Sequence, residues 1–246
     1  MSHSFAYKEI DVEGMHTLSA FSNANKLNKW FFDLIIPYCS GEVLEIGSGI
    51  GNISQFFVHN HASITLSDLR ANYLDTLSKR FPAFSKEKII QLDLVDVDFD
   101  HKYQYLFERF NTIFALNVVE HIKQDSLAIY NCRKLLKKGG TLIILVPAYQ
   151  SLYNRFDQEL EHYKRYTRHS LNSIFLKNEY KIIQSKYFNA AGILGWYVSG
   201  KLLKNKIVPE RQLKFYNRLV PFFRILDKMI FNKIGLSVIT IGQKII

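Results

Sequence analysis

Short apolar runs alternate with helical patterns along residues 43 to 146, and glycine or polar residues follow the runs. The runs are rich in Val, Ile and Leu, which is typical of strands buried in a parallel sheet. This pattern predicts an open, mostly parallel α/β sheet, whose ligands bind at the carboxyl ends of the strands. Strands are expected over Val43–Ile46, Ala62–Ser67, Ile89–Leu92, Thr112–Leu116 and Thr141–Val146.

A helical pattern over residues 16 to 38 precedes the first strand, with large apolar residues at spacings of three and four before Pro37. Two interpretations stay open for it: a helix that covers the edge of the sheet, and a lid over a bound ligand. Further helices are expected over Asn52–Val58, Arg70–Phe81 and Ser126–Lys138, the last ended by Gly139 and Gly140.

The C-terminal third combines β-rich and amphipathic segments. Ser237–Ile245 is expected to close the sheet as an antiparallel strand, with Tyr180–Phe188 as its partner. Ala190–Leu203 and Pro221–Ile230 are apolar-rich helical patterns edged with Lys and Arg. They are interpreted as a helical cap or a dimer surface, with a basic surface resting on anionic lipid as the alternative.

The composition is that of an ordinary globular protein, 48% hydrophobic and 22% charged over 246 residues. The two cysteines, Cys39 and Cys132, have neither the spacing of a metal site nor that of a disulfide framework. The first residues lack a signal-peptide pattern, and the uncharged run Tyr187–Gly200 is shorter than the roughly 20 residues needed to span a bilayer. The expected location is the cytoplasm.

The net charge of +10 is concentrated near the C-terminus. Residues 201–233 contain nine Lys or Arg and two acids, so this segment supplies +7 of the total. The asymmetry indicates one basic face, which suits peripheral contact with an anionic inner membrane surface better than binding of nucleic acid.

The run VLEIGSGIGNIS, residues 43 to 54, places a glycine turn between the first strand and a helix. A ligand can approach bare backbone N–H groups there. A dinucleotide fingerprint G-x-G-x-x-G would need glycine at position 52, where the chain has Asn52, so an oxidoreductase is disfavoured.

With Glu45 the run reads E-x-G-x-G-x-G, and it resembles motif I of the class I S-adenosylmethionine-dependent methyltransferases. The resemblance implies that S-adenosylmethionine is the cofactor, that the loop wraps its methionine end, and that the N-terminal helices form a lid. Cofactor contacts are then expected from Glu45, Gly47, Ser48, Gly49, Gly51 and Asn52.

The same resemblance assigns the residues at the ends of the next three strands. Asp68 would bind the two ribose hydroxyls, with Leu69 beside it, although an acid at this position could also cap a helix. Asp93 would accept from the adenine amino group and the Leu94 N–H would reach a ring nitrogen; the neighbouring acids are interpreted as surface. Asn117 and Val118 would face the methionine part of the cofactor.

The pair Glu120-His121 follows directly after this strand end. His121 could contact the acceptor, or it could be a structural hydrogen-bonding residue. A metal site built from Asp93, Asn117, Glu120 and His121 is disfavoured because the resemblance already assigns Asp93 and Asn117 to the cofactor. No metal is therefore expected.

Residues 149–168 form a polar segment too long for a simple connection, at the edge of the sheet where binding loops tend to lie. The run DQELEHYKRYT resembles a D-x-x-L-G-H-x-R-R-Y element in a subgroup of bacterial methyltransferases of glycans, cell-surface polymers and specialised metabolites. Glu161 stands in place of the usual glycine and Lys164 in place of an arginine, which affects the local backbone and any bidentate anion contact.

His162 is the predicted general base for a hydroxyl acceptor, because an imidazole titrates near neutral pH. Asp157 would orient His162 or bind the acceptor, and Arg165 would hold a carboxylate or phosphate. The alternative is a hydrogen-bonded, stacked loop with no part in the chemistry. Tyr149, Tyr153 and Tyr166 are the predicted pocket walls.

Residues 1–246 are thus interpreted as a single domain of Rossmann-like α/β class, with a seven-stranded sheet whose last strand is antiparallel. Its parts are an N-terminal helical lid (1–40), a cofactor-binding core (41–148), and a substrate-side insertion with a helical cap and closing strands (149–246). The predicted activity is methyl transfer to a small-molecule, glycan or lipid-linked acceptor, with oxygen preferred to nitrogen; a homodimer is a further option. The alternative is a catalytically silent scaffold docked on anionic membranes.

Overall fold

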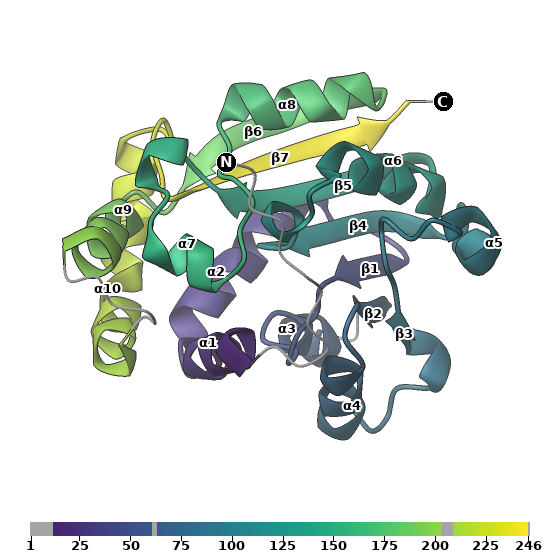
Figure 1. Ribbon diagram of the computed structural model, residues 1–246, viewed down its shortest axis with the longest axis horizontal. Helices are drawn as coiled ribbons and strands as arrows, with labels where there is room; N and C mark the ends of the chain where they lie inside the picture. The colour runs from purple at the N-terminus through teal and green to yellow at the C-terminus, as the bar shows by residue number, and fades with distance from the viewer. Residues whose placement is uncertain (1–11, 61–62, 203–208, 246) are drawn as a thin grey trace.

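The computed structural model describes residues 12–60, 63–202 and 209–245 and contains one seven-stranded sheet in the order β3-β2-β1-β4-β5-β7-β6 (Figure 1). β7 runs antiparallel to both of its neighbours, and every other pairing in the sheet is parallel. The predicted fold class is confirmed, including the pairing of the last strand with β6. The strands are β1 (Val43–Ile46), β2 (Ile64–Asp68), β3 (Ile89–Gln91), β4 (Phe110–Leu116), β5 (Leu136–Pro147), β6 (Tyr180–Phe188) and β7 (Ser237–Lys244).

Helices cover both faces of the sheet and bury one apolar cluster on each side. One cluster joins the sheet to α5, α6 and α8, and the other joins it to α2, α3, α4 and α10. β1 and β5 are buried over nearly their whole apolar length, as their continuous apolar runs predict. The helices are α1 (Val12–Ser22), α2 (Asn25–Ile35), α3 (Ser54–His59), α4 (Ala71–Arg80), α5 (Phe99–Tyr103), α6 (Asp125–Leu135), α7 (Arg155–Glu159), α8 (Arg168–Lys177), α9 (Ala191–Trp196) and α10 (Glu210–Met229).

The N-terminal pattern predicted as one helix over 16–38 is two helices and a short 3-10 turn. The chain breaks at Ala24, whose N–H donates to the Phe21 carbonyl. The side-chain amide of Asn28 donates to the same carbonyl at 2.8 Å, so the end of α1 is satisfied without continuing the helix. The expected lid residues 1–11 lie outside the described residues, as does the predicted strand start at Ala62.

Two further boundaries differ from the predictions because long-range packing overrides local signals. α6 ends at Leu135, three residues before the predicted end, because Leu136 already belongs to β5 and pairs with Phe110 of β4. α10 begins at Glu210 and passes through Pro221, where the helix was expected to start. Buried Leu213 and Val220 hold this helix against α2, which outweighs the hydrogen bond lost at the proline.

α1, α2, α9 and α10 gather at one end of the molecule (Figure 1). The Leu27 N–H of α2 donates to the Asn217 side chain of α10 at 3.0 Å, and Arg224 pairs with Asp33 at 2.8 Å. The apolar segment predicted as a helix over Ala190–Leu203 is α9 followed by a π-helix over Tyr197–Leu202; Leu203 lies outside the described residues. Within the described ranges, no helix combines the length and apolar character that crossing a membrane requires.

Candidate active site

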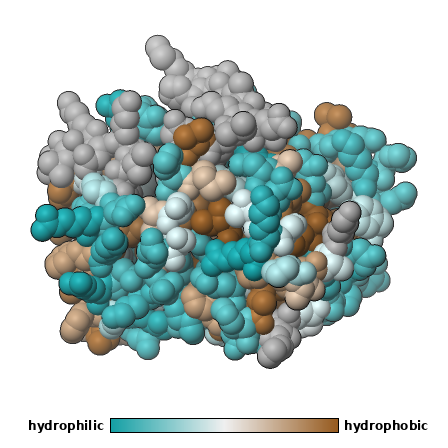
Figure 2. Space-filling view, turned by 90° about the horizontal axis from the view of Figure 1, so that it is seen from below, coloured by the Kyte–Doolittle hydropathy of each residue, from teal (hydrophilic) through white to brown (hydrophobic). Residues whose placement is uncertain are grey.

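A cavity of about 1310 Å³ opens at the carboxyl ends of the central strands. The loop after β1 forms part of its wall, and residues of α1, α9 and α10 form further parts. On the face shown in Figure 2, hydrophobic residues gather around a hollow within a mostly hydrophilic surface. Ligand pockets are commonly about 300–1,000 Å³, so the cavity is larger than a usual pocket for one small molecule.

The loop after β1 needs its glycines for conformation and for space. Gly47 and Gly49 have φ of 68° and 53°, in the left-handed region that side chains disfavour. A Cβ on Gly47 would lie 2.4 Å from the Val118 side chain, and a Cβ on Gly49 would lie 2.8 Å from that of Leu18. The loop therefore presents bare backbone to the cavity at the point where α1 closes over it.

Hydrogen bonds between buried polar groups hold this loop in place. The Ser54 hydroxyl donates to the Glu45 carboxyl group, and burial raises the pKa of Glu45 to about 8. The Ser48 N–H donates to the Ser67 carbonyl at 2.8 Å, and the Ser48 hydroxyl accepts from the Ser67 N–H. Glu45, Ser48 and Asn52, all predicted cofactor contacts, lie on the cavity wall.

Asn52 joins the loop to α1. Its amide nitrogen donates to the Leu18 carbonyl of α1 at 2.9 Å, while its Oδ1 is buried without a hydrogen-bond partner among the described residues. A buried amide oxygen normally has a donor, so a ligand N–H or O–H fits there.

Asp68 lies where the sequence predicted a ribose-binding acid, at the end of β2. Its two carboxylate oxygens accept from the Gly49 N–H at 2.9 Å and the Arg70 N–H at 3.1 Å. Burial raises the pKa of Asp68, and these two N–H groups act in the opposite direction. Each oxygen keeps one more acceptor site, so Asp68 can hold the loop and a ligand diol together.

The predicted adenine residues lie at the end of β3, further along the same wall. The Asp93 side chain accepts from the Val95 N–H at 2.9 Å, and the Asp93 N–H donates to the Tyr103 hydroxyl at 3.2 Å. Leu94 is buried and lines the cavity, as Leu69 does beside Asp68.

Asn117 follows β4 in the left-handed conformation, with φ of 56°, and its N–H donates to the Leu145 carbonyl at 2.8 Å. This turns the chain so that Asn117 and Val118 both face the cavity, with Val118 over Gly47. Eleven of the twelve predicted cofactor residues thus line the cavity, and the twelfth, Gly51, lies in the loop after β1.

The predicted catalytic residues form one buried network. Asp157 Oδ1 lies 2.8 Å from both His162 Nδ1 and Arg165 Nε, and its Oδ2 accepts from the N–H of Asn154, the N-cap residue of α7. Burial alone would raise the pKa of Asp157, but the hydrogen bond from His162 and the charge of Arg165 outweigh it and lower the pKa. Burial lowers the pKa of His162, so its imidazole is neutral near pH 7.

Arg165 is a positioning group rather than a free anion clamp. It is 5% exposed, donates to the Ala148 carbonyl at 3.0 Å, and lies over the Trp196 ring at 4.7 Å. Its charge is already matched by Asp157. The network therefore fixes the ring of His162 on the cavity wall.

Glu120 and His121 lie directly opposite this network. His162 Nε2 is 4.0 Å from the Glu120 carboxylate, and the rings of His121 and His162 meet edge to face at 4.7 Å. Glu120 is fully buried, and neither of its carboxylate oxygens has a hydrogen-bond partner among the described residues. Burial raises the pKa of Glu120 to about 8.

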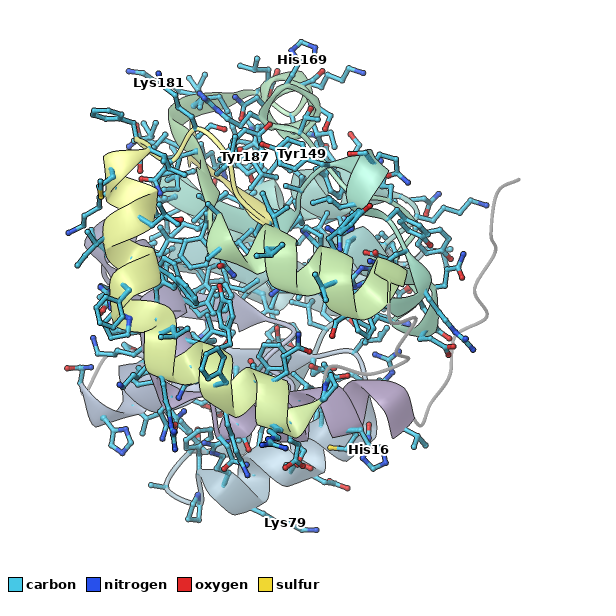
Figure 3. The ribbon with its side chains drawn as sticks, turned by 90° about the vertical axis from the view of Figure 1, so that its left-hand side faces the viewer. His16, Lys79, Tyr149, His169, Lys181 and Tyr187 are labelled. Carbon is cyan, nitrogen blue, oxygen red and sulfur yellow. The ribbon has the colours of Figure 1, made fainter. Side chains whose placement is uncertain are left out.

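The three predicted wall tyrosines lie elsewhere. Tyr149 stacks on Tyr187 at 4.9 Å, at the end of the molecule shown in Figure 3. The Tyr153 hydroxyl donates to the His162 carbonyl, and Tyr166 is a core residue whose hydroxyl donates to Asp125. None of the three lines the cavity, because their hydroxyl groups already have partners behind its wall.

Trp196, Ser199, Gln212 and Tyr216 are among the polar or aromatic cavity residues that the sequence interpretation did not identify. They come from α9, the π-helix and α10, whose patterns were interpreted as a helical cap, a dimer surface or a lipid-facing surface rather than as a cavity wall. The sequence signal available was amphipathicity, which identifies a buried helix face without telling a core from a cavity.

Comparison with known sequences gives the domain type. Residues 44–142 match the sequence profile of a family described as "Methyltransferase domain". The chain is 27% identical over 112 residues to the highly reducing polyketide synthase GPY1 of Gibberella fujikuroi, a stretch that is 42% of this chain and 4% of that protein. The chain thus spans a very small part of the curated relatives that it matches.

Solved structures share the fold. A S-adenosylmethionine-dependent methyltransferase from Archaeoglobus fulgidus superimposes with a TM-score of 0.59 at 16% identity, covering 89% of this chain and 94% of its own. Phosphoethanolamine N-methyltransferase 2 of Haemonchus contortus, in complex with S-adenosyl-L-methionine, gives a TM-score of 0.60 at 14% identity and covers 94% and 57%.

The bare glycine backbone, the orphaned Asn52 oxygen and the acid at the end of β2 fit the donor and acceptor groups of S-adenosylmethionine. The sequence match and the fold agree with this fit. Residues 44–142 thus match a methyltransferase-domain family, and the chain shares its fold with solved S-adenosylmethionine-dependent methyltransferases.

Proposed function

We propose that the protein transfers a methyl group from S-adenosylmethionine to an oxygen of a small-molecule, glycan or lipid-linked acceptor. The observation that carries the proposal is the cavity itself, which runs from the glycine loop to a wall of neutral histidine and carboxyl groups. One end would hold the cofactor and the other the acceptor. The likeness to a region of a polyketide synthase supports a small-molecule acceptor.

When bound, S-adenosylmethionine supplies an electrophilic methyl group on a sulfonium. The residues of the chain then have three tasks: alignment, exclusion of water and handling of the acceptor proton. The glycine loop and Asp68 align the cofactor, and α1, held to the loop through Asn52, covers it. Water is excluded by the apolar side chains of the lid.

The proton-handling group is His162 with its neighbours. Its Nδ1 is hydrogen-bonded to Asp157, so Nε2 is the ring nitrogen that can take the acceptor proton. Nε2 faces Glu120 and His121. An oxygen acceptor has to lose a proton during transfer, whereas a neutral amine can lose it afterwards. This wall therefore favours oxygen over nitrogen as the acceptor atom.

His162→Ala should leave cofactor binding unchanged and slow methyl transfer by about 100-fold or more, the range lost with a proton-handling group. Purified variants are compared by calorimetry with S-adenosylmethionine and by transfer of labelled methyl to glycan, lipid-linked and phenolic acceptors. The matched control is exposed His169, shown at the surface in Figure 3, whose substitution by Ala should change neither quantity. Unchanged turnover in His162→Ala would remove the residue from the chemistry.

We also propose that α10 rests on anionic lipid, which suits a lipid-linked acceptor. Phe215, Phe222 and Met229 on its outer face are 63%, 67% and 69% exposed, and Arg211 and Arg218 lie among them. Apolar side chains flanked by cations are the pattern of an interfacial helix. α10 runs along the side of the molecule that faces the viewer in Figure 3.

Replacing Phe222, Ile225 and Met229 together by Ser should weaken sedimentation with phosphatidylglycerol vesicles at least about tenfold, because each buried side chain contributes about 1.5–3 kcal/mol. Leu176→Ser with Ile183→Ser is the control, since both residues are exposed on other elements. Equal sedimentation of the variant and the parent would refute lipid docking. A loss of self-association instead, seen by analytical ultracentrifugation, would assign the face to a homodimer.

A further inference from the structure

Three side chains of metal-ligand type meet on the cavity wall, two from adjacent residues and the third from a distant segment. The ligand atoms of Glu120, His121 and His162 all lie within 4.8 Å of one another. Glu120 and His121 leave the end of β4 in a 3-10 turn, and His162 follows α7 on the substrate-side segment. The Tyr163 N–H donates to the Glu120 carbonyl at 2.8 Å and holds the two segments together.

Glu120 is the unexplained member of this group. Its side chain is fully buried and lines the cavity, and neither carboxylate oxygen accepts a hydrogen bond from the described residues. A buried carboxylate without a partner is costly, so native structures normally supply a donor or a cation. Arg165 does not fill this place, because its hydrogen bonds go to Asp157 and to the Ala148 carbonyl.

His162 is oriented as a metal ligand would be. The carboxylate of Asp157 holds Nδ1 at 2.8 Å and leaves Nε2 directed to the Glu120 side. Metal-bound histidines usually make this second hydrogen bond to a carboxylate, which fixes the ring and raises its affinity. His121 adds a second imidazole, accessible from the cavity and packed edge to face against the first.

We propose that Glu120, His121 and His162 bind one divalent transition-metal cation, with Zn²⁺ as the best match, and that its remaining positions face the acceptor end of the cavity. Two imidazoles and one carboxylate suit Zn²⁺ or Fe²⁺ better than Mg²⁺ or Ca²⁺, which prefer oxygen ligands. This departs from the expectation of no metal. The sequence alone does not show that His162 returns to the Glu120-His121 turn.

The inference rests on the proposed function and makes the proton-handling group more specific. A hydroxyl bound to the cation would have a lowered pKa and would release its proton to bulk water as the acceptor enters, before the cavity is closed to water. The oxygen lone pair then forms the bond to the methyl carbon, the bond between methyl and sulfur breaks, and the neutral thioether leaves. In this arrangement His162 acts as a ligand rather than as the proton acceptor.

The test is calorimetric titration of the full, chelator-treated and tag-free protein with ZnCl₂, with no cofactor present. We expect one binding site in the parent protein. Removing only the outer hydrogen-bond partner of a metal ligand lowers affinity about 10–100-fold, so Glu120→Gln, which removes a ligand itself, should lower it by more than that. Glu120→Gln keeps the size of the side chain, and its melting temperature shows whether it folds. His169→Ala is the control and should bind Zn²⁺ like the parent.

Cobalt gives a second readout. Co²⁺ bound to this group should produce visible absorption that is absent in Glu120→Gln and in His121→Ala. Absence of binding, or binding unchanged in both variants, would overturn the inference. Binding of S-adenosylmethionine by the same metal-free protein is measured separately, so a failed metal site leaves the proposed methyl transfer standing with His162 as direct proton acceptor.

Discussion

Gly49→Val should lower the affinity for S-adenosylmethionine at least about 100-fold. The new Cβ would lie 2.8 Å from Leu18, and a β-branched residue would have to adopt φ of 53°. The left-handed conformation costs about 1–2 kcal/mol, and losing the hydrogen bond from the Gly49 N–H to Asp68 costs about 1.5–3 kcal/mol. Their sum of about 3–5 kcal/mol corresponds to a loss of 100-fold or more.

Two variants make this result interpretable. Gly139→Ala also places a side chain at positive φ, but in open space away from the cavity, so it should bind the cofactor like the parent. Asp68→Ala removes the loop's carboxylate partner without adding bulk and should also abolish binding. Calorimetry gives the affinities and far-UV circular dichroism shows whether each variant is folded. Normal binding by Gly49→Val would mean that the loop does not form the cofactor site.

Asp157→Ala should destabilise the fold by about 3–5 kcal/mol, the cost of leaving a buried charge without its partner. Arg165 would lose the only carboxylate that the described residues place on its Nε, and His162 would lose its orienting group. α7 would lose the hydrogen bond from the Asn154 N–H to Asp157, one half of its capping box. For a chain of this size the melting temperature should fall by about 6–20 °C.

The control for this variant is Asp100→Asn, which removes an acid from an exposed ion pair with Lys134. Exposed pairs contribute about 0–1 kcal/mol, so the melting temperature should barely change. Differential scanning calorimetry measures both variants. Equal melting temperatures for Asp157→Ala and the parent would contradict the proposed anchoring role of the network.

Most of the sheet could be predicted because its strands are continuous apolar runs and its polar ligand residues follow them directly. Val43–Ile46 and the antiparallel closing strand are examples. The misplaced boundaries have a common cause: Gly139 and Pro221 are strong local signals, and sheet pairing at Leu136 and packing of Val220 against the core override them. Local propensity is a weak guide where tertiary contacts are strong.

The grouping of the predicted cofactor residues could be expected because they lie at the end of β1, in the loop after it, or within three positions of the end of β2, β3 or β4. The grouping on the acceptor side could not be expected. Tyr166 looked like a pocket residue because it is aromatic and lies in a polar segment, yet its hydroxyl is bonded to buried Asp125. The meeting of His162 with Glu120 depends on how a long segment folds back, which no spacing in the sequence encodes.

The central claim is that the cavity binds S-adenosylmethionine and serves methyl transfer. Calorimetric titration of the purified protein with S-adenosylmethionine and S-adenosylhomocysteine tests it most directly. We expect one site for each, with dissociation constants on the order of micromolar, equivalent to about 8 kcal/mol. No binding of either compound to a protein that melts cooperatively would contradict the account and favour a catalytically silent scaffold.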